Sequence, residues 1–108
     1  EVLMDRIMKA INKNLSDCDF GVEQLALEVG ISRAQLHRKM KEMTGIPTSE
    51  FLRNIRLEQA ARILSQKDVN VTQIAYQVGF NNQSYFSTCF KRHFGLSPSE
   101  YAAKSSAK

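Results

Sequence analysis

Hydrophobic residues recur along this chain at the three- and four-residue spacing of amphipathic helices, and no segment alternates in the manner of a β-strand. Near the start, for example, Ile7, Ala10, Ile11 and Leu15 fall on one stripe, while charged residues occupy the positions between them. The pattern predicts an all-α fold of seven helices. Their expected ranges are 2–14, 22–29, 33–43, 48–66, 71–77 and 83–93, followed by a last short helix opened by Ser97-Pro98.

Glycine and small polar residues mark where these helices should begin and end. Gly30 and Gly79 stand at sharp turns, where glycine can adopt the left-handed conformation. Ser32 and Asn82 each precede a helix and suit its N-cap, because their side-chain oxygens can accept a hydrogen bond from a free backbone N–H. Pro98 falls in the first turn of the last helix, where proline is tolerated.

The long middle helix, residues 48–66, changes its apolar face halfway along. At about 100° per residue, the apolar side chains of its two halves lie in two different sectors. The first sector holds Phe51, Leu52 and Ile55, the second holds Leu57, Ala60, Ala61 and Leu64, and Ile63 is the outlier. Such a helix has its two ends buried in different units. We therefore expect a first subdomain over about residues 1–47, a connecting helix over about 48–66 and a second subdomain over about 67–104.

Residues 25–51 and 74–101 are two copies of one pattern. The first copy is LALEVGISRAQLHRKMKEMTGIPTSEF and the second is IAYQVGFNNQSYFSTCFKRHFGLSPSEY. Matched residues are 49 positions apart before the inner turn and 50 after it, so one residue is inserted near Asn81 or Asn82. A short helix, a glycine turn and a second helix make a helix-turn-helix, and the sequence predicts two of them.

Positive charge is concentrated on the second helix of each copy. The 108 residues include 15 Lys and Arg and 11 Asp and Glu, for a net charge of +4. Residues 1–30 hold three basic and six acidic residues, residues 31–45 hold four basic and one acidic, and residues 81–93 hold two basic and none acidic. Basic helices at matched places favour a nucleic-acid surface. The alternative, a solvated basic face, is common for one helix but less expected for both.

The second helix of each copy also has an inward apolar stripe and an outward polar face. The stripes are Leu36, Met40 and Met43 in the first copy and Phe86, Phe90 and Phe94 in the second. The outward positions superpose at an offset of 50: Arg33, His37 and Lys41, flanked by Ala34 and Arg38, match Gln83, Ser87 and Lys91, flanked by Ser84 and Thr88.

These outward residue types suit double-stranded DNA. Arg can donate two hydrogen bonds to guanine, Gln can pair with adenine, and Ser or Thr can meet base edges or a thymine methyl. We expect base contacts from Arg33, Ala34, His37, Arg38, Gln83, Ser84, Ser87 and Thr88, led by His37 and Arg38 in the first copy. Phosphate contacts, which position a protein without specifying sequence, are expected from Ser32, Lys41, Asn82, Lys91 and Arg92. His37 could instead face solvent without a role, and His93, near a helix end, is expected to be structural.

Other chemistry finds little support in the sequence. Cys18 and Cys89 are too few for a disulfide framework and lack ligand spacing, so we expect no metal and no cofactor. There is no HExxH motif, phosphate-binding glycine loop or Cys–His pair, so we expect no enzyme. No apolar run reaches about 18 residues, which predicts a soluble chain without membrane contact. A helical protein-interaction module is the alternative function, and the Glu start and AAKSSAK end suggest a fragment of a longer protein.

Over about residues 4–103 the chain resembles the DNA-binding domain of AraC/XylS-type bacterial transcription regulators. The stretch ARILSQKDVNVTQIAYQVGFNNQSYFSTCFKRHFGLSPSEY looks like the family's C-terminal signature, and ISRAQLHRKMKEMTGIP looks like its first reading helix. The resemblance implies two helix-turn-helix units in adjacent major-groove segments of promoter DNA, and by position it supports Ala34, Arg38 and Thr88. Ala34 is smaller than the base-contacting residue of some members, which weakens the expectation of readout there.

A narrower likeness is to the output domains of response regulators and hybrid two-component sensors. It rests on DRIMKAINKNLSDCDFGVEQLA, with SRAQLHRKMKEMTG and FLRNIRLEQAARIL. The likeness implies control by an upstream phosphorelay, and N-terminal sensor or receiver domains outside this chain. The broader resemblance to AraC/XylS-type regulators implies RNA polymerase as a partner of an activator, and a cytoplasmic, nucleoid-associated location.

Overall fold

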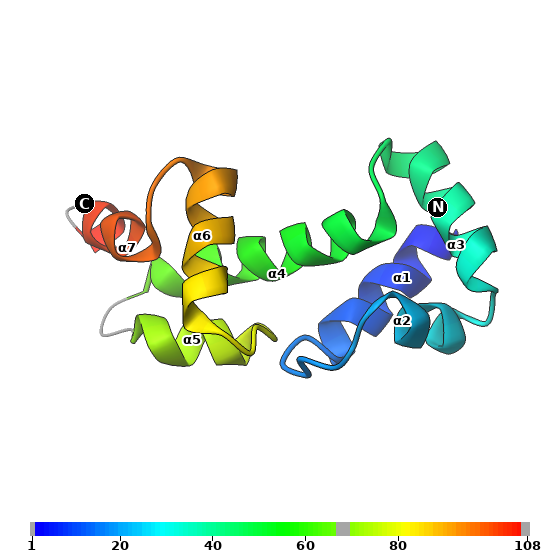
Figure 1. The fold of residues 1–108 in the computed structure, drawn as a ribbon, viewed down its shortest axis with the longest axis horizontal. Coiled ribbons are helices and arrows are strands. Elements are labelled where there is room, and N and C mark those ends of the chain that lie inside the picture. Colours follow the sequence, from blue (N-terminus) through cyan, green and yellow to red (C-terminus); the bar gives the residue numbers. More distant parts are fainter. Residues whose placement is uncertain (1, 67–69, 107–108) are drawn as a thin grey trace.

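Seven α-helices form the computed structural model, which describes residues 2–66 and 70–106 (Figure 1). They are α1 (Val2–Lys13), α2 (Val22–Val29), α3 (Arg33–Thr44), α4 (Thr48–Leu64), α5 (Val71–Gln77), α6 (Gln83–Phe94) and α7 (Pro98–Ser106). The described part of the chain contains no strand, and the predicted all-α fold is confirmed.

Most predicted helix ends agree with the structure to within one residue, and α4 shows the largest difference. We predicted this helix to residue 66, but it ends at Leu64. The reason is local: the Gln66 N–H donates to the carbonyl of Ile63, three residues back, so the four-residue ladder of an α-helix is not continued. The predicted start of the second subdomain, residue 67, lies outside the described residues.

The predicted turns and N-caps are confirmed in both copies of the repeat. Gly30 and Gly79 have φ angles of 79° and 92°, in the left-handed region that favours glycine. Ser32 Oγ accepts a hydrogen bond from the Gln35 N–H at 3.1 Å, and Asn82 Oδ1 accepts one from the Tyr85 N–H at 2.8 Å. These caps set the first residues of α3 and α6, and so fix which side chains stand at the start of each helix.

Two separate hydrophobic cores share α4, as the switch of its apolar face predicts. Leu52 belongs to the core formed by α1, α2 and α3, with Phe51 and Ile55 packed against it. The second half of α4 belongs to the core of α5, α6 and α7, and contributes Leu57, Ala60, Ala61 and Leu64. In Figure 1, α4 runs between two helical lobes, with α3 and α6 near its opposite ends. The molecule measures 43 × 23 × 23 Å.

The repeat is longer than the two helix-turn-helix motifs, because α1 and α4 also correspond. At an offset of 50, Arg6 matches Arg56, and the buried residues Ile7, Ala10 and Ile11 match the buried Leu57, Ala60 and Ala61. Each helix-turn-helix therefore packs on a preceding helix of the same kind. The helix α4 closes the first unit and opens the second.

Arg56, at the middle of α4, is a buried charged residue, with only 6% of its surface exposed. Its guanidinium donates hydrogen bonds to four backbone carbonyls: Leu15, Asp17 at 3.2 Å, Phe20 at 2.8 Å and Val78 at 2.8 Å. Burial lowers the pKa of this guanidinium below its ordinary value, and the nearby charge of Asp17 opposes that shift. A buried arginine is tolerated here because carbonyl oxygens satisfy its donors.

Candidate nucleic-acid interface

The outward face of α3 is exposed as the sequence predicts. Leu36 and Met40 are fully buried. The predicted base-contacting residues of this helix all face solvent, namely Arg33, Ala34, His37 and Arg38, as does the predicted phosphate ligand Lys41. The helix therefore presents one continuous polar face, and the structure brings these five residues together along it.

The two arginines of this face differ in their surroundings. Arg33 forms an ion pair with Glu23 of α2 at 3.3 Å, with both side chains more than half exposed, so the pair is worth little and can be broken by a ligand. Among the described residues Arg38 takes part in no ion pair. Lys41 Nζ donates to the Gly45 carbonyl at 3.4 Å, near the end of the helix. Arg38 is thus the arginine most available for a new partner.

A shallow recess beside this face is formed where α3 meets the start of α4. Arg33, Ala34 and His37 line one side of the recess, and Val22, Pro47, Thr48 and Ser49 line the rest. The small side chain of Ala34 leaves this recess open. A base edge or a sugar can approach the backbone of α3 more closely here than beside a larger residue.

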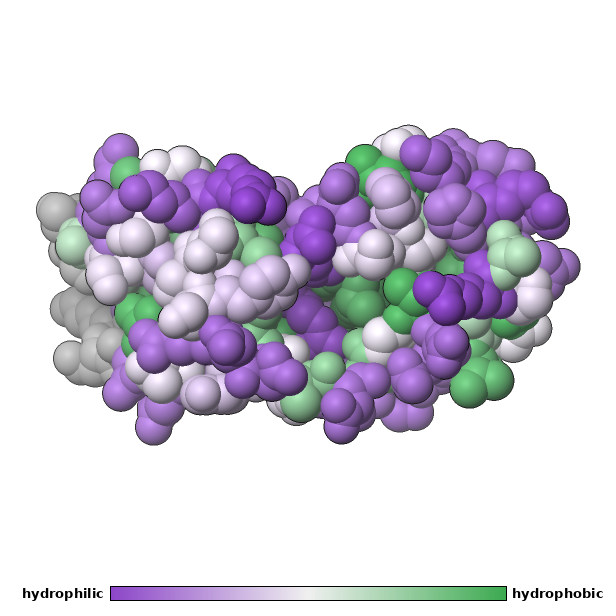
Figure 2. Space-filling model, in the orientation of Figure 1, coloured by the Kyte–Doolittle hydropathy of each residue, from purple (hydrophilic) through white to green (hydrophobic). Residues whose placement is uncertain are grey.

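The outward face of α6 is polar but carries charge only at its far end. Gln83, Ser84 and Thr88 are exposed, whereas Ser87 is only partly exposed. The Thr88 hydroxyl donates to the Ser84 carbonyl at 3.0 Å, one turn back, so this hydroxyl is already engaged within the helix. Figure 2 shows this lobe as paler than the lobe around α3, which mixes strongly hydrophilic residues with some hydrophobic ones.

The predicted phosphate ligands fall into two kinds. Lys91 and Arg92 are exposed on the last turns of α6, and neither forms an ion pair with another described residue. Ser32 and Asn82 are also exposed, but their side-chain oxygens are engaged as N-caps. The N-terminus of each helix remains open to solvent, and its unpaired backbone N–H groups attract anions. The side-chain N–H₂ group of Asn82 also remains available as a donor.

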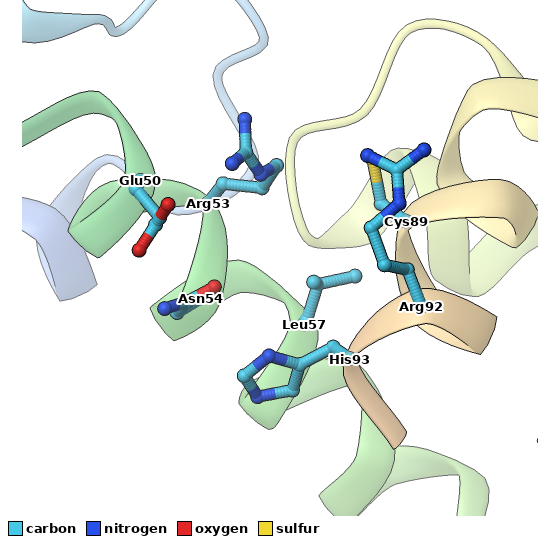
Figure 3. A pocket seen from close by; sticks show the side chains of 7 residues that line it. All are labelled: Glu50, Arg53, Asn54, Leu57, Cys89, Arg92 and His93. Atoms are coloured by element: carbon cyan, nitrogen blue, oxygen red, sulfur yellow. The ribbon is translucent and has the colours of Figure 1, made fainter. Parts of the chain in front are cut away.

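Sequence reasoning missed one basic residue of this surface, Arg53 of α4. It lines a recess between α4 and α6 together with Glu50, Asn54, Leu57, Cys89, Arg92 and His93. In Figure 3 the guanidinium groups of Arg53 and Arg92 lie on the same rim of this recess, although the residues come from different helices. The sequence does not indicate that the two arginines are neighbours, because Arg53 lies 39 positions before Arg92 and outside the repeated motif.

His93 lies on the opposite side of that recess from the two guanidinium groups (Figure 3). Its Nε2 is 3.9 Å from a carboxylate oxygen of Glu58 on α4, and its ring packs edge-on against Phe94. The Glu58 contact lies between α6 and α4, whereas the Phe94 contact lies within α6. Both are contacts within the fold, in line with the structural role that we expected of His93.

These features together define a class of protein: a helical molecule with two helix-turn-helix motifs and a basic, polar face on the second helix of each. None of the described helices is both long and apolar enough to cross a membrane.

A family profile described as "Helix-turn-helix domain" matches residues 25–104. The chain belongs to this family, and specifically to its AraC-type DNA-binding domains. This is a family of transcription regulators and not of enzymes.

Individual relatives agree with this assignment. The chain is 39% identical, over 94% of its length, to "Histidine kinase P4" of Formosa agariphila, and 38% identical, over 70% of its length, to the "HTH-type transcriptional activator RhaS" of Klebsiella pneumoniae. It spans 7% and 27%, respectively, of those two proteins. The DNA-binding domain of AdpA, a global transcriptional factor solved in complex with a target DNA, shares 30% identity at a TM-score of 0.86, over 97% of this chain and 93% of that one.

Proposed function

We propose that this domain reads two neighbouring stretches of promoter DNA, with α3 in one major-groove segment and α6 in the next. The supporting observation is the matched pair of outward faces, which carry groove-compatible side chains at positions 50 residues apart. The major groove returns to one face of the duplex every ~34 Å. α3 and α6 lie near opposite ends of α4 in a molecule whose longest dimension is 43 Å, which suits that spacing.

Within the first groove segment, Arg38 is the principal reader of bases and His37 its neighbour. Arg38 is exposed and unpaired among the described residues, so its planar fork can bind the O6 and N7 atoms of guanine. Arg33 contributes after leaving Glu23, and Ala34 makes a close apolar contact rather than a hydrogen bond.

Within the second segment, Gln83, Ser84 and Ser87 supply hydrogen bonds and Thr88 supplies a methyl contact to thymine. The hydroxyl of Thr88 is already engaged with the Ser84 carbonyl, which leaves the methyl group for an apolar contact. Phosphates on either side are bound by Lys41, Lys91 and the N-termini of α3 and α6. Arg53 and Arg92, which share one rim of their recess, bind the phosphates that run between the two groove segments.

The parent protein is a cytoplasmic two-component regulator or sensor that carries its sensor or receiver domains before this one. The likeness to a histidine kinase of which the chain spans 7% supports this arrangement. In that setting the domain associates with the nucleoid and activates transcription by contacting RNA polymerase.

The alternative function, a protein-interaction module, needs apolar residues on the outward faces of α3 and α6. Among the described residues of these two helices, Tyr85 is the large hydrophobic side chain that is exposed, and its ring centroid lies 5.9 Å from that of Phe80. These faces therefore offer little apolar surface to a protein partner.

Selection of bound duplexes from random DNA tests the proposal directly. We expect the chain to enrich two unlike sequence blocks about one helical turn apart, and to bind the selected duplex on the order of 10³-fold more tightly than random DNA. One enriched block would restrict α6 to phosphate contacts, whereas no enrichment and weak binding would contradict the proposal.

Replacing Arg38 with alanine should weaken binding to the selected duplex by about 1–3 kcal/mol and relax the base preference at a single position. The measurement is a titration against the selected duplex and against duplexes with one base pair changed. Arg38→Lys is the matched variant, because it keeps the charge and loses the planar fork. An equal loss on every duplex would make Arg38 a phosphate ligand instead.

Replacing Lys91 with alanine should weaken binding uniformly across sequences. The slope of log affinity against log salt concentration should fall by about one unit, because one fewer counterion is released. Lys13 on α1 serves as the control: it carries the same charge, pairs with Glu28 at 3.8 Å and lies on neither of the two proposed DNA-reading helices, so Lys13→Ala should leave the slope unchanged. An unchanged slope in Lys91→Ala would remove this contact from the interface.

A further inference from the structure

Arg56 connects the α1–α2 loop of the first unit to the helix-turn-helix of the second. Three of its four carbonyl partners, those of Leu15, Asp17 and Phe20, belong to the α1–α2 loop of the first unit. The fourth, Val78, belongs to the turn of the second helix-turn-helix. In Figure 1 that loop and that turn approach each other beside the middle of α4.

The matching arginine of the first unit shows what is special about Arg56. Arg6 of α1 donates to the carbonyl of Val29, the residue before the turn glycine, just as Arg56 donates to Val78. Both arginines thus hold the turn of their own helix-turn-helix. Arg6 is exposed and its bond stays within one unit, whereas Arg56 is buried and also binds the loop of the other unit.

Gly79 and Leu15 complete this junction. A Cβ atom on Gly79 would overlap the Arg56 guanidinium and the Leu15 carbonyl, so the turn and the loop can share one guanidinium only because this residue is glycine. The Leu15 side chain packs against both hydrophobic cores. Beyond these contacts, the helices of the first unit do not pack extensively against α5, α6 or α7 in the part of the chain that the structure describes.

We propose that Arg56 is a positioning residue that locks the two units at one separation and rotation, and so makes the domain selective for the number of base pairs between its two half-sites. The inference rests on the proposed function. One added base pair moves a half-site by about 3.4 Å and rotates it by about 35° about the duplex axis. A chain held together by α4 alone can follow part of that change by bending at mid-helix, where its packing changes sides. The hydrogen bonds of Arg56 to both units restrict this bending.

The test compares the duplex from the selection with duplexes whose two blocks are one base pair closer or one base pair farther apart. The wild-type chain should bind both altered duplexes on the order of tenfold more weakly, because one unit loses its base contacts. Arg56→Met should bind the selected duplex more weakly while its penalty for altered spacing shrinks to about threefold or less. Arg6→Met, the control at the matched position, should keep the full spacing penalty.

A second measurement reports the geometry without DNA. Residual dipolar couplings of the backbone N–H groups in α2 and α3 and in α5 and α6 should fit one alignment tensor in the wild type and in Arg6→Met, and two in Arg56→Met. Where Arg56→Met does not fold, Arg56→Lys, which cannot reach all four carbonyls, and Leu15→Ala give the same readouts.

The outcomes separate the two proposals. A wild-type chain that selects no two-block site contradicts the proposed function. The wild-type chain could show a clear spacing penalty that is unchanged in the Arg56 and Leu15 variants. This result contradicts the positioning role of Arg56 and leaves the proposed function intact. If Arg56→Met weakens binding equally at all spacings and its couplings fit one alignment tensor, the positioning role is likewise overturned. Arg56 would then contribute to stability alone.

Discussion

Replacing Gly79 with alanine is expected to destabilise the protein by about 3 kcal/mol or more, because two unfavourable effects coincide at this residue. Its φ of 92° lies in the region that L-residues rarely adopt. The new methyl group would also overlap the Arg56 guanidinium and the Leu15 carbonyl, so the guanidinium would have to leave carbonyls to which it donates. Urea unfolding followed by circular dichroism measures the loss.

Gly95 provides the control for this prediction. Its φ of 82° is as unusual as that of Gly79, but nothing lies within 4 Å of the position of an added Cβ. Gly95→Ala should therefore cost only the backbone strain, about 1–2 kcal/mol. Similar losses for the two variants would show that the contact with Arg56 adds nothing at Gly79.

Replacing Phe90 with alanine should cost about 3–5 kcal/mol, with the loss concentrated in the second unit. Phe90 is fully buried, and its ring centroid lies 5.7 Å from that of Phe86, 4.5 Å from that of Phe94 and 5.4 Å from that of Tyr101. The cavity would thus open at the centre of an aromatic cluster that joins α6 to α7. Hydrogen exchange of individual backbone N–H groups shows where protection is lost.

The matched variant is Met40→Ala, at the equivalent position of α3, where a fully buried side chain holds the first core together. It should cost about 2–5 kcal/mol and lower protection mainly in α1, α2 and α3. On DNA, Phe90→Ala should lose preference for the block read by α6 and retain preference for the other block. Equal loss of protection in both units, in either variant, would mean that the chain unfolds as one cooperative body and not as two subdomains.

Much of the fold was predictable because local signals agreed with one another. Glycines at the turns, Ser32 and Asn82 as N-caps, and the change of apolar face along α4 each depend on residues close in sequence. The repeat then related distant parts of the chain to each other, because two copies of one motif are expected to adopt the same local structure. The outward faces of α3 and α6 followed from helical periodicity. The binding roles of their residues stay predictions, and so does the division into subdomains.

The parts that escaped prediction depend on contacts between distant segments. Arg56 lies in mid-helix, where a charged residue is normally solvent-exposed, and only the fold shows that carbonyls from residues 15–20 and 78 surround it. Arg53 joins Arg92 only when α6 packs on α4. The correspondence between α1 and α4 was hidden because few identical residues carry it and because α4 also belongs to the first unit.

The use of α4 by both units has a consequence for how such a regulator can change in evolution. Inserting or deleting one residue near Arg56 would turn the second unit by about 100° and shift it by about 1.5 Å relative to the first. A change in the length of α4 therefore cannot adjust the phase between the two half-sites by a small amount. Point substitutions on α3 and α6, by contrast, alter one base contact at a time. In regulators with this architecture, the base sequence of the DNA site should therefore diverge much faster than the distance between its two blocks.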